Sequence, residues 1–144
     1  AYQADCITMG NEFKPDFIFN WQQPQSFTNF NGKSGKSYKV PAVPPKFATV
    51  DKCLQICKER GLKMRGHVLV WHSQTPEWFF KENFNNAGGF VKKDIMDKRL
   101  ESFIKNTFDL LKSQYPKLNV YAYDVCNELF LNDGGGMRPA GNSN

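Results

Sequence analysis

Three groups of polar residues follow short apolar stretches of the sequence, at positions 11–14, 67–74 and 124–128. Each apolar stretch is typical of a β-strand, so each polar group falls where a predicted strand ends. The carboxyl ends of parallel strands meet at one edge of an α/β sheet or barrel, where enzymes of these classes build their sites. The sequence therefore predicts one site that gathers the three groups, with the carboxylate Glu128 after the last strand.

Each of these residues also has a structural interpretation when it is considered alone. A single histidine, His67 or His72, is more often a hydrogen-bonded structural residue, and Asn127 alone is more often a turn or capping residue. Lys14 alone would be a surface residue, and Glu128 could be the first solvent-exposed position after a buried strand. Clustering at all three strand ends favours a site over these separate explanations.

Other site chemistries fit the same residues less well. His67, His72, Cys126 and Glu128 are possible zinc ligands, but the two histidines are five residues apart and face opposite ways on a regular strand. No HExxH or paired-cysteine signature is present. Ser73 lacks the glycine context of a nucleophile elbow, and nothing beside Cys126 supplies a base. We expect neither a metal site nor a cofactor.

Several elements must position these residues. In order, we expect a buried strand at 5–9, a long polar connection at 20–45, a helix from Pro45 or Lys46 to a Gly61 cap, a strand at 62–71, a polar loop at 73–89, a helix at 92–113 and a strand at 119–126. Alternation of strands and helices predicts parallel strands with helical crossovers, hence an α/β layer or barrel. Three parallel strands with two open edges are a poor independent sheet, which favours a part of something larger.

The composition limits the possible partners. The chain has 144 residues and a net charge of +5, but its lysines are scattered and accompany no nucleic-acid motif. No apolar run approaches the ~20 residues of a membrane span, and no basic-then-apolar leader stands at Ala1. We expect neither nucleic acid nor membrane as a partner. The four cysteines lack disulfide or zinc spacing, so we expect buried free thiols.

The order of residues in the three motifs resembles a known family. Residues 65–74 (RGHVLVWHSQ) and 123–128 (YDVCNE) look like the third-strand and fourth-strand segments of the family-ten glycoside hydrolases, mostly endo-β-1,4-xylanases. Residues 11–14 (NEFK) are similar to the second-strand segment. The resemblance implies part of a (β/α)8 TIM barrel, about strands two to four, and a secreted or extracellular enzyme. It also implies endo-hydrolysis of xylan with retention at the anomeric carbon.

The resemblance also implies a role for individual residues. Glu128 would be the general acid/base and Asn127 would bond the 2-hydroxyl of the sugar at the cleavage point. Substrate would further contact His67, Trp71, Lys14, Asn11 and Gln74, whereas His72 and Trp78 would support the site. Gly10 stands where the family usually has a glutamate, so one hydroxyl-binding carboxylate is missing.

The family's nucleophile is on its seventh strand, and none of the other acids in this chain has that strand context. We therefore expect residues 1–144 to be a partial catalytic domain that cannot turn over xylan alone, with a downstream segment or a second polypeptide completing the barrel. Residues 129–144 are expected to be a flexible, Gly-rich loop or break point. A non-catalytic carbohydrate-binding or scaffold protein that has kept the barrel site is the alternative.

Overall fold

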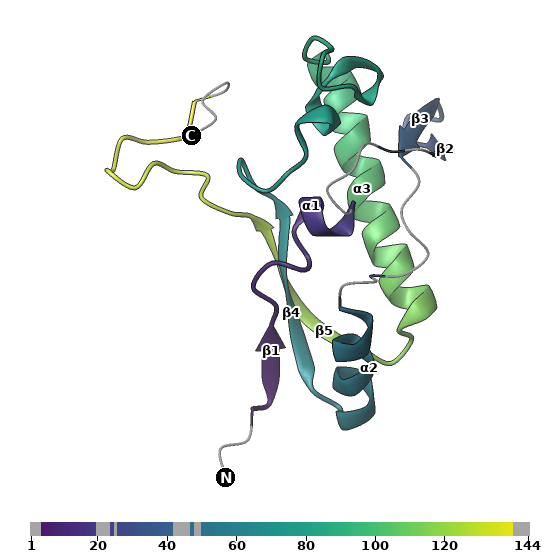
Figure 1. The fold of residues 1–144 in the computed structure, drawn as a ribbon, viewed down its shortest axis with the longest axis vertical. Coiled ribbons are helices and arrows are strands. Elements are labelled where there is room, and N and C mark those ends of the chain that lie inside the picture. Colours follow the sequence, from purple (N-terminus) through teal and green to yellow (C-terminus); the bar gives the residue numbers. More distant parts are fainter. Residues whose placement is uncertain (1–3, 20–23, 25, 42–46, 48–49, 140–144) are drawn as a thin grey trace.

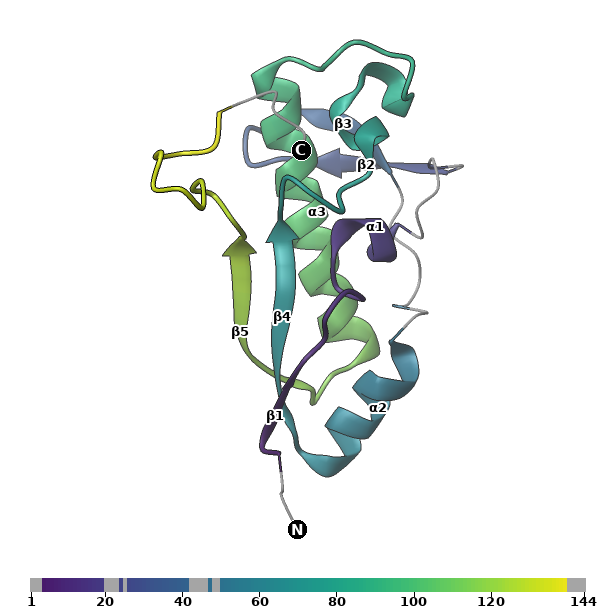
Figure 2. The same cartoon turned by 60° about the vertical axis from the view of Figure 1, so that its left-hand side comes forward.

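A parallel three-stranded sheet forms the centre of the molecule. The computed structural model describes residues 4–19, 24, 26–41, 47 and 50–139. Strands β1 (Cys6–Thr8), β4 (Lys63–Val70) and β5 (Asn119–Cys126) pair in the order β1-β4-β5, all parallel, as Figures 1 and 2 show. The three predicted strands and their parallel arrangement are thus confirmed. Strand β1 is shorter than expected and both of its end residues, Cys6 and Thr8, are exposed, because β1 is an edge strand with one neighbour.

Helices α2 (Asp51–Arg60) and α3 (Lys93–Gln114) connect the strands as crossovers (Figure 1). Gly61 caps α2 in the left-handed conformation, with a φ of 66°, as predicted. The helix was expected to begin at Pro45 or Lys46, which lie outside the described residues. This start was wrong, because the helix begins only at Asp51. The cause is tertiary packing, because the Phe47 ring is 5.1 Å from that of Phe13 and is buried before the helix begins.

The connection at 20–45 is not wholly irregular, which corrects the prediction. Strands β2 (Phe27–Asn31) and β3 (Ser37–Pro41) form an antiparallel hairpin within it, beside α3 in Figure 2. The hairpin was not predicted because the composition of its strands is mostly polar. Each strand buries few side chains, among them Phe30 and Val40. Gly35 closes the turn with a φ of 73°, which glycine adopts without steric cost.

The apolar core lies between the sheet and the two helices. Its buried members include Phe13, Leu54, Met64, Phe103, Leu110 and Tyr115. The stripe predicted on α3 is confirmed for Phe103, Thr107 and Leu110, which are all buried. Burial of these apolar side chains is the main source of stability for such a fold. The cysteines are free as expected, but Cys6 and Cys126 are exposed and only Cys57 is buried, because the outer strands are covered incompletely.

A compact lobe joins β4 to α3 and contains two short 3-10 helices, η1 (Glu77–Phe80) and η2 (Glu82–Phe84). The buried Arg99 of α3 anchors it, since its Nη1 donates to the main-chain oxygens of Phe79 (2.7 Å) and Lys81 (2.8 Å). Its guanidinium also lies 3.9 Å from the Phe84 ring centroid. No helix in the described part of the chain is long and apolar enough to cross a bilayer.

The short helix α1 (Pro15–Ile18) carries a buried acid, Asp16. Burial raises the pKa of Asp16 to about 6. Since the ordinary pKa is about 3.9, folding favours the protonated form. The stability that this preference contributes is fully present below about pH 4 and is lost as pH rises through 6.

Replacing Asp16 with asparagine is therefore expected to stabilise the protein by roughly 1–2 kcal/mol near neutral pH, because a buried charge is removed. Little gain is expected near pH 4. Urea unfolding at the two pH values measures the difference, with the exposed Asp94→Asn as a matched control. A gain of equal size at both pH values would contradict the explanation by charge burial.

Candidate active site

The register of β4 and β5 brings the predicted site residues to one edge of the sheet. Val70 is paired with Cys126, and the Asn127 main-chain N–H continues the ladder by donating to the Val70 oxygen at 3.0 Å. Trp71 directly follows β4, and Glu128 follows Asn127 just beyond the end of β5. Their side chains consequently meet just beyond the carboxyl ends of β4 and β5.

The carboxylate of Glu128 has two ring neighbours. The Trp71 indole N–H donates to Glu128 Oε2 at 2.9 Å, and His72 Nε2 lies 3.6 Å from the same oxygen. The Glu128 side chain is 41% exposed, so it is open to a substrate from solvent. Its backbone has a φ of +50°, in the left-handed region that residues with a Cβ rarely adopt. Such strain is common at functional positions.

Lys14 organises a second group of polar side chains. Its Nζ donates to Asn11 Oδ1 at 2.8 Å and to Gln74 Oε1 at 2.5 Å, and lies 4.6 Å from the centroid of the Trp71 ring. Only 6% of Lys14 is exposed, so the surface interpretation of this lysine was wrong. The Asp16 N–H donates to the Gln74 main-chain oxygen at 3.0 Å and ties α1 to the loop after β4. An aromatic face beside an ammonium and two amides suits a polyhydroxylated ligand.

His67 belongs to a third group, on the strands themselves. His67 Nδ1 lies 2.9 Å from Asp124 Oδ2, and Arg65 Nε donates to Asp124 Oδ1 at 2.8 Å. Burial raises the pKa of Asp124, but the hydrogen bonds and positive charges of Arg65 and His67 outweigh it and hold this pKa below its usual range. Asp124 is thus ionised and fixes the orientation of His67. An ionised carboxylate only accepts hydrogen bonds, so His67 Nδ1 carries a proton and donates it to Asp124.

The sequence predictions did not assign a role to Arg65 or Asp124. The signal was present, because residues two apart on a strand share a face, so Arg65 and His67 both point to the side where Asp124 lies. The two histidines face different carboxylates, His67 toward Asp124 and His72 toward Glu128. In the part of the chain that the structure describes, no three His, Cys, Asp or Glu side chains group as metal ligands do.

The sequence model of the family "Glycosyl hydrolase family 10" matches residues 1–143 of this chain, nearly its full length. The chain belongs to glycosyl hydrolase family 10. The recognition drawn from the three motifs is therefore confirmed.

Curated relatives of this family 10 chain are xylanases by name. The chain is 52% identical over 141 residues to the bifunctional endo-1,4-beta-xylanase XylA of Ruminococcus flavefaciens, covering 97% of this chain and 14% of that protein. It is 40% identical over 148 residues to endo-1,4-beta-xylanase A of Butyrivibrio fibrisolvens, covering 98% of this chain and 36% of that protein. The chain thus spans well under half the length of these two relatives.

Solved structures place the fold in the same family. The xylanase 10B modules of Clostridium thermocellum, solved with xylohexaose, match with a TM-score of 0.74 and 38% identity over 97% of this chain and 26% of that one. A Caldicellulosiruptor owensensis endo-1,4-beta-xylanase matches with a TM-score of 0.64 and 28% identity, over 94% of this chain and 33% of that one. These matches support the expected fold class, a part of a (β/α)8 barrel.

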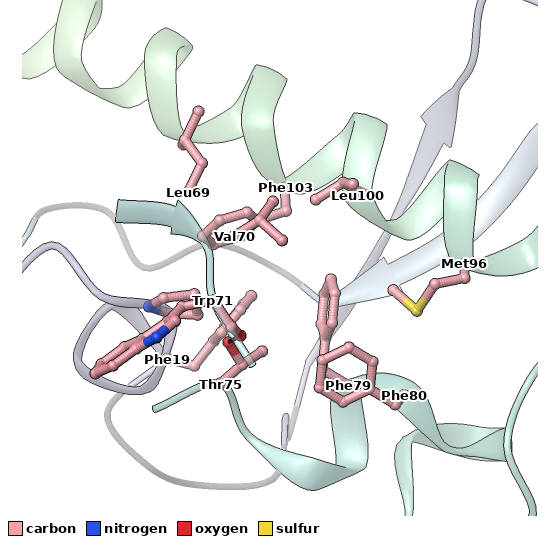
Figure 3. A pocket seen from close by; sticks show the side chains of 11 residues that line it. Phe19, Leu69, Val70, Trp71, Thr75, Phe79, Phe80, Met96, Leu100 and Phe103 are labelled. Atoms are coloured by element: carbon pink, nitrogen blue, oxygen red, sulfur yellow. Dashed lines mark hydrogen bonds between the residues drawn. The ribbon is translucent and has the colours of Figure 1, made fainter. Parts of the chain in front are cut away.

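In the family 10 chain an apolar cavity of about 140 Å³ lies next to Trp71, one of the predicted site residues. Figure 3 shows Leu100 and Phe103 of α3 on one side and Phe79 and Phe80 of η1 on another, with Trp71 at the margin. The Thr75 hydroxyl donates to the Trp71 main-chain oxygen, and the other lining side chains are apolar. Polar ligand groups would lose their hydrogen bonds there, so the cavity does not suit a polyhydroxylated ligand.

Replacing Asp124 with asparagine tests the anchor of His67. A carboxylate with a depressed pKa contributes stability above its ordinary pKa, and this contribution is lost as pH falls through the folded-state value. The wild type is therefore expected to be more stable than Asp124→Asn at about pH 6, with an advantage that shrinks toward about pH 3. Chemical unfolding across this range measures it, and a constant difference would contradict the ion-pair explanation.

Proposed function

We propose that the protein hydrolyses internal β-1,4-xylosidic bonds of xylan with retention, and that Glu128 is its general acid/base. One observation carries the proposal: Glu128 stands at the strand-end edge with Oε2 bonded to the Trp71 indole, beside the Lys14 group. Membership of family 10 and the names of the relatives support the substrate class.

In the first step the protonated Glu128 would give its proton to the oxygen of the leaving sugar. Trp71 already donates to Oε2, and among the described residues no donor is seen on Oε1, so Oε1 is the oxygen that would carry the proton. A second carboxylate would attack the anomeric carbon and form a covalent intermediate. In the second step the ionised Glu128 would take a proton from water as the water oxygen attacks the anomeric carbon. The bond from that carbon to the second carboxylate then breaks, which releases the sugar.

The attacking carboxylate would come from elsewhere in the barrel. Asp124 is on β5, four residues before Glu128, but its oxygens are hydrogen-bonded to Arg65 and His67, so it is not free to attack. Retaining chemistry needs the two carboxyl groups about 5–5.5 Å apart. We therefore propose that a downstream segment or a second polypeptide supplies the nucleophile and completes the barrel, and that residues 1–144 alone do not turn over xylan.

The remaining site residues would hold the sugars. Lys14, Asn11 and Gln74 form one hydrogen-bonded group against the Trp71 face, which suits the hydroxyls of a neighbouring xylose. His67 has Nε2 free of the Asp124 bond and would contact another hydroxyl. Asn127, fixed through its main chain to Val70, would bond the 2-hydroxyl, an interaction that strengthens in the transition state. A polysaccharide substrate is consistent with a secreted or extracellular enzyme.

Proton NMR of xylo-oligosaccharide hydrolysis tests the proposal. The sample is the intact protein, which here means residues 1–144 together with the segment or polypeptide that completes the barrel. The first-formed reducing end should be the β-anomer, and xylan should yield short oligosaccharides through internal cleavage. An α-anomer as first product would overturn retention. Binding of xylan without any hydrolysis would favour a non-catalytic carbohydrate-binding protein instead.

A further inference from the structure

A short hairpin immediately follows Glu128 and ends at Arg138. Phe130 and Met137 form an antiparallel bridge, and the Leu131 N–H donates to the Gly136 oxygen at 2.9 Å. Gly134 and Gly136 turn the chain with φ values of 76° and 88°, which residues with a Cβ seldom adopt. Residues 128–138, the Glu128 hairpin, are thus a defined turn of the chain.

Arg138 makes two hydrogen bonds that close this hairpin. Its main-chain N–H donates to the Leu129 oxygen at 2.8 Å, and its side-chain Nε lies 3.3 Å from the main-chain oxygen of Glu128 and donates to it. The first bond is available to any residue except proline. The second requires a side-chain donor of this reach, and Arg138 is the residue that provides it.

The Glu128 backbone needs such support. Its φ of +50° is unfavourable for a residue with a Cβ and persists only where the surroundings hold it. On the amino-terminal side, the Asn127 N–H fixes the chain to Val70 of β4. On the carboxyl-terminal side, Arg138 donates to the Glu128 oxygen itself. The direction of the Glu128 side chain depends on this conformation, because the backbone dihedrals set where its Cβ points.

We propose that Arg138 is a positioning residue, which holds the Glu128 backbone in its left-handed conformation and thereby aims the carboxyl group at Trp71 and the leaving oxygen. Arg138 acts through Glu128 and needs no contact with the sugar. The inference rests on the proposed role of Glu128 as acid/base. Misplacement of a catalytic group by about 1 Å costs on the order of 10²-fold in rate, so the side chain of Arg138 has a measurable effect.

The test compares two substrates whose leaving groups differ in their need for an acid. The leaving group of xylotetraose is a sugar oxygen, which requires protonation to depart. The leaving group of 2,4-dinitrophenyl β-xylobioside is a phenolate, which departs without protonation. Arg138→Ala in the intact protein should lower kcat/KM for xylotetraose by about 10-fold or more. For the dinitrophenyl substrate the loss should be less than about 3-fold, because positioning of the acid is dispensable there.

Two further variants and an additive sharpen the result. Arg138→Lys keeps a side-chain donor of different reach and should show the same selective loss to a smaller extent, and added guanidinium ion should partly restore Arg138→Ala. Asn132→Ala, an exposed substitution on the same hairpin, should leave both substrates unchanged. If Arg138→Ala does not fold, as judged by circular dichroism, Arg138→Lys alone must show the selective loss.

Equal losses on the two substrates, or no loss on either, would overturn the proposal, since a merely structural role of Arg138 does not distinguish leaving groups. Glu128→Ala in the same assay separates the two proposals. If Glu128→Ala shows the selective loss and the Arg138 variants do not, only the role of Arg138 fails. If Glu128→Ala shows no selectivity, the proposed acid/base role fails with it.

Discussion

Glu128→Ala is expected to lower kcat/KM for xylotetraose by roughly 10²–10⁴-fold, because the variant has no group to protonate the leaving oxygen. Hydrogen bonds of Lys14 to Asn11 and Gln74 do not involve Glu128, so affinity for the oligosaccharide should change little. Steady-state kinetics of the intact protein and calorimetric titration with xylotetraose measure the two quantities separately.

Glu77→Ala is a matched control for this result. Glu77 is a glutamate on the lobe after β4, 64% exposed and paired at the surface with Lys81. Surface pairs of this kind contribute little, so activity should remain within about 2-fold of the wild type. A Glu128→Ala protein with wild-type kcat/KM, or one whose loss is matched by Glu77→Ala, would contradict the assignment.

Gly66→Ala is expected to destabilise the protein by about 2–3 kcal/mol, the largest effect on stability that we predict. A Cβ at Gly66 would overlap the ring of Tyr123 on the neighbouring strand β5. That ring has little room to move, because it packs edge-on against Phe13 and Phe108 with centroids 6.3 Å and 5.4 Å away. Urea unfolding of the intact protein measures the loss.

A second substitution identifies the cause of that loss. Combining Gly66→Ala with Tyr123→Leu removes the obstructing ring, so the double variant should be more stable than the sum of the two single losses implies. Gly89→Ala is the control, since a Cβ there meets no atom within 4 Å. Strict additivity of the two substitutions would show that the clash with Tyr123 is not the cause.

The features predicted correctly are those that depend on local patterns. Strands at 62–71 and 119–126 have apolar and β-branched composition, and they are β4 and β5 in the structure. Gly61 caps its helix because only a residue without a Cβ enters the left-handed region at no cost. Gathering of Trp71 and Glu128 followed from the rule that parallel strands bring their carboxyl ends together.

The features that were missed depend on contacts between distant residues. Phe47 is outside the helix because it packs on Phe13, which no local pattern reveals. The hairpin at 27–41 has mostly polar strands whose pairing is set by register across a turn. Lys14 was ambiguous for the same reason: its buried side chain donates to Gln74, sixty positions away. The expected flexibility of residues 129–144 stays a prediction, although 128–138 contains a bridged hairpin.

The most direct test of the central claim is the configuration of the product that Glu128→Ala forms with azide and 2,4-dinitrophenyl β-xylobioside. If Glu128 is the acid/base, the covalent intermediate still forms, and azide releases it as the β-glycosyl azide after two inversions. If Glu128 were the nucleophile, azide would attack the substrate directly and give the α-glycosyl azide. We predict the β-azide, and NMR of the product showing the α-azide, or no azide adduct, would contradict the account.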